Sequence, residues 1–266
     1  MGPEIAPEGI DPSIVSPARM YDYLLGGTHN FKVDQAAADY VLRFAPELRD
    51  LALENRKCLR RFVNFATSSG IRQFLDIGSG LPTAQNVHQI AQQALPDART
   101  AYVDSDYTTL LHASALLSDD PNTVFVKADA TRPRDILDHP DIRQLLNFDE
   151  PIAVLMIALL HFVPNGANPR AIVAEIMNAT PKGSMLAITH ATSDDIDPAL
   201  NEFIKQMYTN SPAPLIMRSG QEIENIFGAL PIAEGKLVDI GRWGVSEGEA
   251  AELGRMRALF GYAIKD

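Results

Sequence analysis

Hydrophobic and polar positions along the chain follow two different periods. Between residues 46 and 70, apolar side chains recur at helical spacing, which predicts one long amphipathic helix. Residues 16–27 contain a typical helix start, with Pro17 in the first turn, and two glycines that end the helix. A further helix is expected to begin near Asp34. The segment that precedes residue 70 is therefore predicted to be mainly helical.

Beyond residue 70, short β-rich runs alternate with helical segments. The runs expected as strands are IRQFLDI, ARTAYVD, NTVFVKAD, PIAVLMI and GSMLAITHA, and the helical segments include 82–95, 107–117 and 169–179. Strand, helix and strand at this spacing predict a parallel sheet with helices on both faces. Two final runs, GKLVDIGRWG and RALFGYAIKD, predict an antiparallel hairpin at one edge. The expected fold class is α/β, with a Rossmann-like, doubly wound and mainly parallel sheet of seven strands.

The pattern divides the chain into an arm and one domain. Residues 1–17 hold four prolines and little hydrophobic periodicity, so they are expected to form an extended arm. Residues 18–266 contain no linker, internal repeat or low-complexity tract, which indicates a single domain with its α/β core at 71–266. Late in that core, Ser219 and Glu222 have the spacing of a capping box at a helix start.

Composition narrows the function classes. The chain has 266 residues, 46% of them hydrophobic, and its one cysteine excludes an internal disulfide and favours a reducing, cytoplasmic location. The N-terminus carries no secretory signal, and the apolar runs are too short to span a bilayer. A formal net charge of -11 repels nucleic-acid phosphates, so neither a nucleic acid nor a membrane is an expected partner. The oligomeric state leaves no signal in the sequence.

The stretch QFLDIGSGLPTAQN places Asp76 and two glycines at the end of a buried strand. Gly78 and Gly80 allow a sharp backbone turn, and no side chain fills the space above them. Pro82 is expected in the first turn of the following helix, where backbone amides are open to a ligand. The stretch therefore predicts a nucleotide-type crevice.

The residues of this turn do not suit a dinucleotide. The fingerprint G-x-G-x-x-G lacks its third glycine, because the residues after Gly80 read LPT. The carboxylate of Asp76 would repel a pyrophosphate and prefers a cationic neighbour. A ligand with an ammonium group and a ribose but no phosphate fits better, and S-adenosylmethionine is the commonest of these.

Acids at three successive strand ends give the sequence a resemblance to the class I S-adenosylmethionine-dependent methyltransferases. Besides Asp76, Asp104 ends the strand in AYVDSD, 24 positions beyond Gly80, and Asp129 follows the next strand in VKADAT. The resemblance implies S-adenosyl-L-methionine as cofactor, with Asp104 accepting hydrogen bonds from the ribose hydroxyls and Asp129 one from the adenine amino group. Each acid alone is also explained as a turn residue or a helix cap.

The resemblance narrows to a group of actinobacterial methyltransferases of unassigned substrate, known as a domain of unknown function (DUF574). It is carried by PARMYDYLLGGTHNFKVDQAAADYVL, DIGSGLPTAQNVHQIAQ and YVDSD. It implies that residues 18–70 form a helical lid over the cofactor. The cofactor-binding residues it implies are Tyr21, Gly27, Asn30, Asp76, Gly78, Gly80, Asp104, Ser105, Asp129 and Ala130.

The N-terminal members of this set also have simpler explanations. Gly27 is explained as part of a helix stop, Asn30 as a turn residue and Tyr21 as part of the core. Arg19 also lies near the pocket in this resemblance, but it can pair with Asp22 or cap a surface, and no substrate role is assigned to it.

Methyl transfer of this kind needs no covalent intermediate and no metal, because the methyl group is already activated and the enzyme holds donor and acceptor in line. A small-molecule acceptor is favoured, since IALLHF stands where amine-methylating relatives carry Asn/Asp-Pro-Pro-Tyr. His161, just after the fourth strand, is the candidate general base for a hydroxyl acceptor, with His190 second. Either histidine is equally explained as a structural side chain, and a carboxylate acceptor needs no base. Trp243 either lines the acceptor pocket or packs in the core.

Two other functions stay open. An NAD-dependent oxidoreductase would use Asp104 on the ribose of its cofactor, although the missing glycine and Asp76 argue against it. A non-catalytic protein could keep S-adenosylmethionine binding without methyl transfer, because the binding residues and the transfer chemistry lie in different parts of the chain.

Overall fold

A computed structural model describes the chain from residue 10 to residue 266, apart from 83–85, 107–108, 110–119 and 209–213. The helix expected at 107–117 and most of the expected N-terminal arm therefore lie outside the described residues.

The described strands form one sheet in the order β3-β2-β1-β4-β5-β7-β6. Their bounds are β1 Gln73–Ile77, β2 Arg99–Asp104, β3 Thr123–Lys127, β4 Ala153–Ile157, β5 Met185–Ala191, β6 Val238–Asp239 and β7 Ala258–Ile264. The first five strands pair in parallel, and β7 pairs antiparallel with both β5 and β6. β1, β4 and β5 are buried along their whole length, as expected of parallel strands covered on both faces. The expected fold class is confirmed.

The antiparallel edge is shorter than the sequence predicts. β7 pairs with β5 from Ala258 to Ile264, whereas β6 consists only of Val238–Asp239. The rest of GKLVDIGRWG is not strand, because the Asp239 carboxylate accepts a hydrogen bond from the Gly241 N–H at 3.0 Å and so closes a turn.

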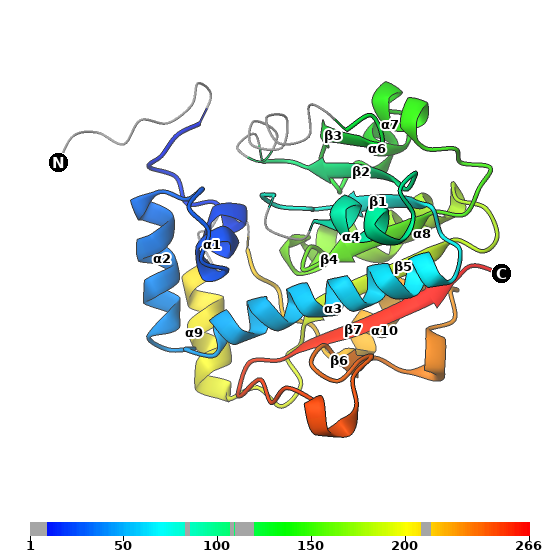
Figure 1. Ribbon diagram of the computed structural model, residues 1–266. Helices are drawn as coiled ribbons and strands as arrows, with labels where there is room; N and C mark the ends of the chain where they lie inside the picture. Colours follow the sequence, from blue (N-terminus) through cyan, green and yellow to red (C-terminus); the bar gives the residue numbers. More distant parts are fainter. Residues whose placement is uncertain (1–9, 83–85, 107–108, 110–119, 209–213) are drawn as a thin grey trace.

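Nine labelled helices surround the sheet in the described part of the chain (Figure 1). Their bounds are α1 Pro17–Leu24, α2 Lys32–Leu42, α3 Leu48–Ser68, α4 Val87–Ala94, α6 Pro133–Leu137, α7 Pro140–Leu145, α8 Pro169–Asn178, α9 Pro198–Tyr208 and α10 Gly220–Phe227. The predicted caps at Ser16 and Ser219 are present. The predicted start at Pro82 is wrong: α4 begins five residues later, where the backbone N–H of Asn86 donates to the side chain of Gln89 at 2.9 Å.

Three hydrophobic clusters hold the layers together. One lies between the sheet and α3 with α4, and another lies on the opposite face under α8 and α10. A third and smaller cluster joins α1, α2 and α3 through Met20, Leu24, Val41 and Ala52. Because α3 contributes Leu59 and Phe62 to the first cluster and Ala52 to the third, it anchors the N-terminal helices to the sheet.

Helices α1, α2 and α9 lie beyond the carboxyl ends of the parallel strands (Figure 1). The chain runs from β1 outward to β3 on one side and from β4 to β5 on the other, so the direction of winding changes between β1 and β4. In doubly wound sheets, ligands bind at the carboxyl ends beside such a switch point. The N-terminal helices thus cover the expected ligand position.

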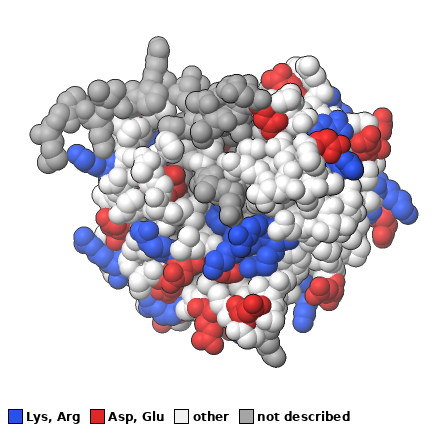
Figure 2. Space-filling view, viewed as in Figure 1, with Lys and Arg blue, Asp and Glu red and all other residues white. Residues whose placement is uncertain are grey.

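The surface seen from this side carries both charge signs. Figure 2 shows Lys and Arg side chains gathered over the middle of the face, where α3 crosses it, with Asp and Glu side chains around them. The sequence of α3 includes Arg56, Lys57, Arg60 and Arg61. No helix in the described part of the chain has the length and apolarity needed to cross a bilayer.

Candidate active site

A cavity of about 630 Å³ opens at the carboxyl ends of β1, β2, β4 and β5. Its walls come from the strand ends and from α1, α3 and α9, so it lies at the switch point between β1 and β4. A volume of this size is typical of sites for small molecules, which run from roughly 300 to 1,000 Å³. The residues proposed from the sequence that line it are Tyr21, Asp76, Gly78, Gly80, Asp104, Ser105, His161 and His190.

The turn after β1 has the geometry that its glycines require. Gly78 has φ +74°, and a Cβ there would lie 2.5 Å from Cδ1 of Leu159. Gly80 has φ +66°, but a Cβ there would meet no atom within 4 Å. Gly78 is thus demanded by packing between β1 and the β4 loop, whereas Gly80 leaves open space beside the cavity.

Asp104, the last residue of β2, holds this turn in place. Its carboxylate accepts a hydrogen bond from the Gly80 N–H at 2.8 Å and another from the Asp106 N–H at 2.9 Å. Burial raises the pKa of Asp104, while these hydrogen bonds act in the opposite direction. Both carboxylate oxygens keep further lone pairs, so Asp104 can also accept bonds from a ligand.

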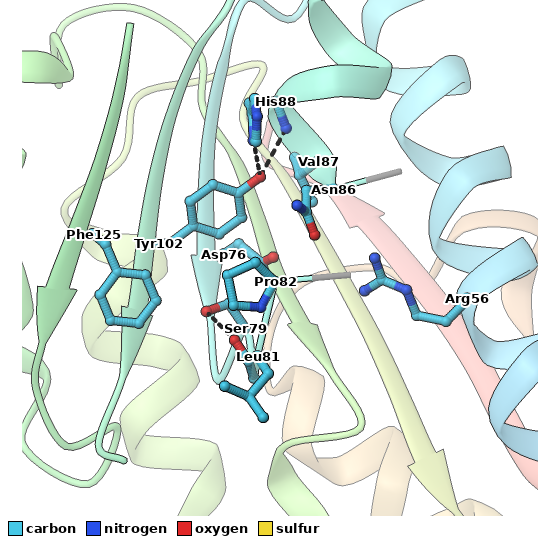
Figure 3. A pocket seen from close by; sticks show the side chains of 11 residues that line it. Arg56, Asp76, Ser79, Leu81, Pro82, Asn86, Val87, His88, Tyr102 and Phe125 are labelled. Atoms are coloured by element: carbon cyan, nitrogen blue, oxygen red, sulfur yellow. Dashed lines mark hydrogen bonds between the residues drawn. The ribbon is translucent and has the colours of Figure 1, made fainter. Parts of the chain in front are cut away.

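Asp76 is the most unusual group of the site. Its side chain is buried, with 5% of the residue exposed, and no hydrogen bond joins the carboxylate to any described residue. Burial raises the pKa of Asp76 to about 7, the positive charge of Arg56 lowers it in part, and the negative charge of Asp104 raises it further. Figure 3 shows Arg56 reaching from α3 toward Asp76 and the glycine turn. A buried carboxylate whose oxygen lone pairs accept no hydrogen bond from a described residue is suited to bind a cationic group of a ligand.

Two side chains of α3 complete this end of the cavity, and the sequence reasoning missed both. Asn55 is buried, and its Oδ1 has no hydrogen-bond partner among the described residues. Its Nδ2 donates to the Tyr21 hydroxyl at 3.0 Å, and that hydroxyl donates to the Ala52 carbonyl at 3.1 Å. Arg56 follows in the chain and lines the same cavity. A signal existed for Asn55, because this polar residue falls on the apolar face of an amphipathic helix.

A second, narrow cleft of about 10 Å³ adjoins the cavity, and Asp76, Ser79 and Gly80 line both (Figure 3). Tyr102 forms its floor, and the Tyr102 hydroxyl accepts a bond from the His88 backbone N–H and shares one with His88 Nδ1, both at 2.8 Å. His88 itself is buried. The reason is that α4 packs its first turn against β2 through this tyrosine.

The β4 and β5 ends carry a buried network built on Arg218. The Arg218 guanidinium donates to the carbonyls of Leu160 and Val163, each at 2.7 Å, and lies 2.8 Å from His190 Nε2. His190 Nδ1 lies 2.8 Å from the Ala191 carbonyl. Sequence reasoning missed Arg218, because no local pattern marks a residue that reaches back 58 positions to Leu160.

The two histidines of the site are neutral at pH 7. Burial, with the nearby charge of Arg218 as a smaller cause, lowers the pKa of His190 to about 4. Burial also lowers the pKa of His161 well below its usual value, and His190 and Arg218 act in the same direction. The two rings lie 5.5 Å apart between centroids.

Backbone strain marks the segment between β4 and His161. Ala158, which lines the cavity, has φ +55°, a left-handed conformation that costs a non-glycine residue about 1 kcal/mol or more. Its N–H donates to Oγ1 of Thr189 at 2.8 Å, which fixes the strained turn. Leu159 and His161, which follow this turn, line the cavity.

Two predicted residues lie elsewhere in the described structure. Asp129 accepts a hydrogen bond from the Thr131 N–H at 2.8 Å and thereby closes the turn after β3, and neither it nor Ala130 lines the cavity. Of the three acids expected to converge, the cavity therefore contains Asp76 and Asp104.

Gly27 and Asn30 also lie off the cavity wall. Both serve the buried carboxylate of Asp22, which accepts bonds from Asn30 Nδ2 at 2.7 Å and the His29 N–H at 2.8 Å. A Cβ on Gly27 would lie 2.0 Å from Oδ1 of Asp22. Gly27 is thus required by a folded loop.

Arg19 pairs with Asp34 and not with Asp22. Its Nε lies 2.6 Å from Oδ2 of Asp34, and both side chains are buried. The expected pairing with Asp22 is wrong because Asp22 faces the loop at 27–30, while Asp34 also accepts the Ser16 N–H at 2.9 Å. Ser16 in turn donates its hydroxyl to Asp106 at 2.5 Å, which joins the start of α1 to the segment after β2.

Trp243 lies in an aromatic cluster with Phe62, Phe65, Phe260 and Tyr262 and does not line the cavity. Its core-packing interpretation is therefore confirmed. No group of three or more metal-ligating side chains is found among the residues that the structure describes.

Comparison with known proteins gives a family and two similar solved structures. The sequence model of the S-adenosyl methyltransferase family matches residues 3–265. A crystal structure of a provisionally assigned methyltransferase from Thermobifida fusca has a TM-score of 0.90 at 37% identity and covers 98% of each chain. That of a DUF574 family protein from Streptomyces avermitilis has a TM-score of 0.90 at 33% identity and covers 96% of this chain and 99% of its own. No curated protein matches the chain.

Proposed function

The chain belongs to the S-adenosyl methyltransferase family and is an S-adenosylmethionine-dependent methyltransferase, and we propose that it methylates a small molecule bound in the 630 Å³ cavity. The cofactor and the acceptor share this cavity, the cofactor at the β1 and β2 ends and the acceptor at the β4 and β5 ends. Residues 18–70 act as the lid, because α1 and α3 supply one wall of the cavity.

The observation that carries this proposal is a pair of buried acceptors that have no hydrogen-bond donor in the described part of the chain. Asp76 and Asn55 both line the cavity, and neither the Asp76 carboxylate nor Asn55 Oδ1 has a hydrogen-bond donor among the described residues. A buried acceptor left unpaired costs about 1–3 kcal/mol, so the arrangement is favourable only with a donor-rich ligand. An ammonium group offers three N–H donors and a positive charge, and Arg56 beside it matches a carboxylate. The residues therefore fit the amino-acid portion of S-adenosylmethionine.

The remaining contacts follow from the same geometry. Asp104 accepts the ribose hydroxyls while it holds Gly80, and Gly80 with Ser105 leaves room for the sugar. Tyr21 holds Asn55 in position. Asp129 and Ala130 are proposed at the adenine end, and Gly27 and Asn30 support the lid through Asp22.

Catalysis by this chain is a matter of position and of water exclusion. When bound, the cofactor supplies an electrophilic methyl group on a positively charged sulfur. The strained turn at Ala158 and the ring of His161 face the acceptor region, and the surrounding apolar side chains keep water out. Holding the reacting atoms in line contributes most of the rate in such a transfer, which proceeds without a covalent enzyme intermediate.

Calorimetric titration of the purified protein tests the proposed site. S-adenosylhomocysteine is expected to bind with a stoichiometry of one, and NADH is expected to give no heat of binding. Incubation with labelled S-adenosylmethionine and a small-molecule extract should then label a small product. Binding of NADH without S-adenosylhomocysteine would favour the oxidoreductase, and tight S-adenosylhomocysteine binding with no labelled product would favour a non-catalytic binding protein.

A further inference from the structure

The acceptor half of the cavity is lined mainly by apolar side chains. Its side chains come from helices, from the β4 loop and from the segment before β7, and representative ones are Leu24, Leu51, Phe162, Ile204, Leu215 and Met256. Arg19 also lines the cavity, but its charge is matched by Asp34 at 2.6 Å. An acceptor that fills such a space gains from an apolar skeleton, at about 25 cal/mol for each Å² removed from water.

A chain of hydrogen bonds fixes where the protons of the two histidines lie. Arginine stays protonated and only donates, so His190 Nε2 must accept the bond from Arg218 at 2.8 Å. The proton of neutral His190 is then on Nδ1, where it donates to the Ala191 carbonyl at 2.8 Å. The same residue, Ala191, donates its N–H to His161 Nδ1 at 3.4 Å. Neutral His161 therefore carries its proton on Nε2.

This arrangement makes His161 a hydrogen-bond donor. Nδ1 already accepts a bond from β5, and Nε2 has its proton and no hydrogen bond to a described residue. Taking up a further proton would create an imidazolium beside His190 and Arg218 in a buried site, and both neighbours oppose a positive charge there. His161 thus offers an N–H to the acceptor and is not an efficient proton acceptor.

We propose, on the basis of the methyl-transfer function above, that the acceptor is an apolar molecule whose methylated oxygen is already ionised, such as a hydrophobic carboxylic acid or an acidic phenol. The Nε2–H of His161 donates to that oxygen and positions it. An oxygen lone pair forms the new O–C bond to the methyl group while the C–S bond breaks, and the electron pair of that bond stays on sulfur. The anion and the sulfonium become a neutral ester or ether and a neutral thioether, so no proton has to leave.

Matched acceptor probes test the ionised-oxygen requirement. The protein saturated with S-adenosylhomocysteine is titrated with 3-phenylpropanoate, straight-chain carboxylates of increasing length and pentafluorophenol. The alcohol and the amine with the 3-phenylpropyl skeleton serve as controls. The same compounds are then incubated with labelled S-adenosylmethionine. At least one anionic probe is expected to bind ten times more tightly than its alcohol or amine partner and to be methylated on oxygen. Whether the carboxylates or the phenol are bound and methylated shows which class of anion the site accepts.

Preferential methylation of the alcohol or the amine would overturn the inference, and so would the absence of binding by every anionic probe. Either result, with S-adenosylhomocysteine still binding, leaves the proposed function intact. Failure of S-adenosylhomocysteine itself to bind would instead contradict the proposed function.

Two variants of His161 separate a donor from a base. His161→Gln keeps an N–H donor but cannot serve as a base, whereas His161→Leu removes both. If His161 positions the oxygen, Gln is expected to keep acceptor affinity within about fivefold while Leu weakens it at least tenfold. Unchanged S-adenosylhomocysteine affinity shows that both variants are folded. An equal loss of turnover in both variants at unchanged acceptor affinity would overturn the donor role.

Discussion

The two ends of the cavity treat buried polar groups in opposite ways. At the β1 and β2 ends, Asp76 and Asn55 Oδ1 are buried without donors in the described structure. At the β4 and β5 ends, Arg218 meets two carbonyls and His190, and His190 meets the Ala191 carbonyl. The first pair of groups is completed only by a ligand, whereas the Arg218 network is complete within the fold. The difference separates polar groups that are suited to bind a ligand from polar groups that hold a neighbour in place.

The largest effect on stability is expected from removing Arg218. Arg218→Leu leaves the Val163 carbonyl and His190 Nε2 without a donor among the described residues, and at about 1–3 kcal/mol for each orphaned acceptor the free energy of unfolding should fall by about 3 kcal/mol or more. Urea denaturation measures it. The control Arg134→Leu removes an exposed ion pair with Glu175 and should cost under about 1 kcal/mol. Equal losses in both variants would contradict the contrast between the two ends.

Asp76→Asn should weaken S-adenosylhomocysteine binding on the order of a hundredfold at pH 8, because a buried carboxylate facing an ammonium is replaced by a neutral amide. Calorimetry measures this loss. The control Asp97→Asn, in an exposed pair with Arg72, should leave the affinity unchanged. An unchanged affinity in Asp76→Asn would place the ammonium elsewhere.

Although Asp76→Asn should weaken ligand binding, it should stabilise the ligand-free protein at high pH. The pKa of Asp76 is about 7 in the folded protein, against an ordinary value of 3.8 that applies to the unfolded chain. The folded state therefore binds more protons between these values, and the contribution of Asp76 to stability falls as pH rises from about 4 to 7. At pH 8 the variant should melt a few degrees above the parent, and the gap should close near pH 4. Ligand affinity of the parent should rise from pH 6 to 7.5, a trend that the Asp76→Asn substitution would abolish.

Asp104→Ala should weaken S-adenosylhomocysteine binding about tenfold to a hundredfold, because charge-assisted bonds to two hydroxyls are worth about 1.5–3 kcal/mol and the Gly80 N–H loses its acceptor. Asp104→Asn, which keeps one acceptor oxygen, should fall between Ala and the parent in the same titration. Equal affinities of the parent and Ala proteins would show that the ribose binds elsewhere.

Asn55→Leu should weaken binding roughly threefold to tenfold, because one neutral acceptor for the ammonium is lost at about 1 kcal/mol. The matched control is Asn64→Leu on the exposed face of the same helix, which should bind as the parent does. A loss as large as that of Asp76→Asn would mean that the substitution displaces Tyr21, which Asn55 holds.

Asp129→Ala is expected to have the smallest effect, a loss of about twofold to fivefold in S-adenosylhomocysteine affinity from one hydrogen bond to adenine. The carboxylate already accepts from the Thr131 N–H, so a small loss of stability should accompany it. If the variant is slightly destabilised but binds S-adenosylhomocysteine as the parent does, Asp129 only stabilises the turn after β3 and does not bind adenine.

The sheet and the glycine turn were predictable because their signals are local. Buried strands read as short apolar runs, and Gly78 and Gly80 stand where a backbone turn needs positive φ. The start of α4 was misread, since Pro82 suits a first helical turn as well as the loop that precedes Asn86. Arg218 was out of reach, because its role depends on carbonyls that the fold brings from 55 to 58 positions away. The role of such a residue follows from its tertiary contacts, which no local sequence pattern reveals.

The buried Asp76 carboxylate also makes cofactor uptake an acid-releasing event. With a pKa of about 7, about half of the ligand-free molecules at neutral pH hold a proton on this side chain. An arriving ammonium group expels that proton into the solvent. The heat of uptake should therefore vary with the ionisation enthalpy of the buffer, and a weakly buffered solution should acidify as the site fills.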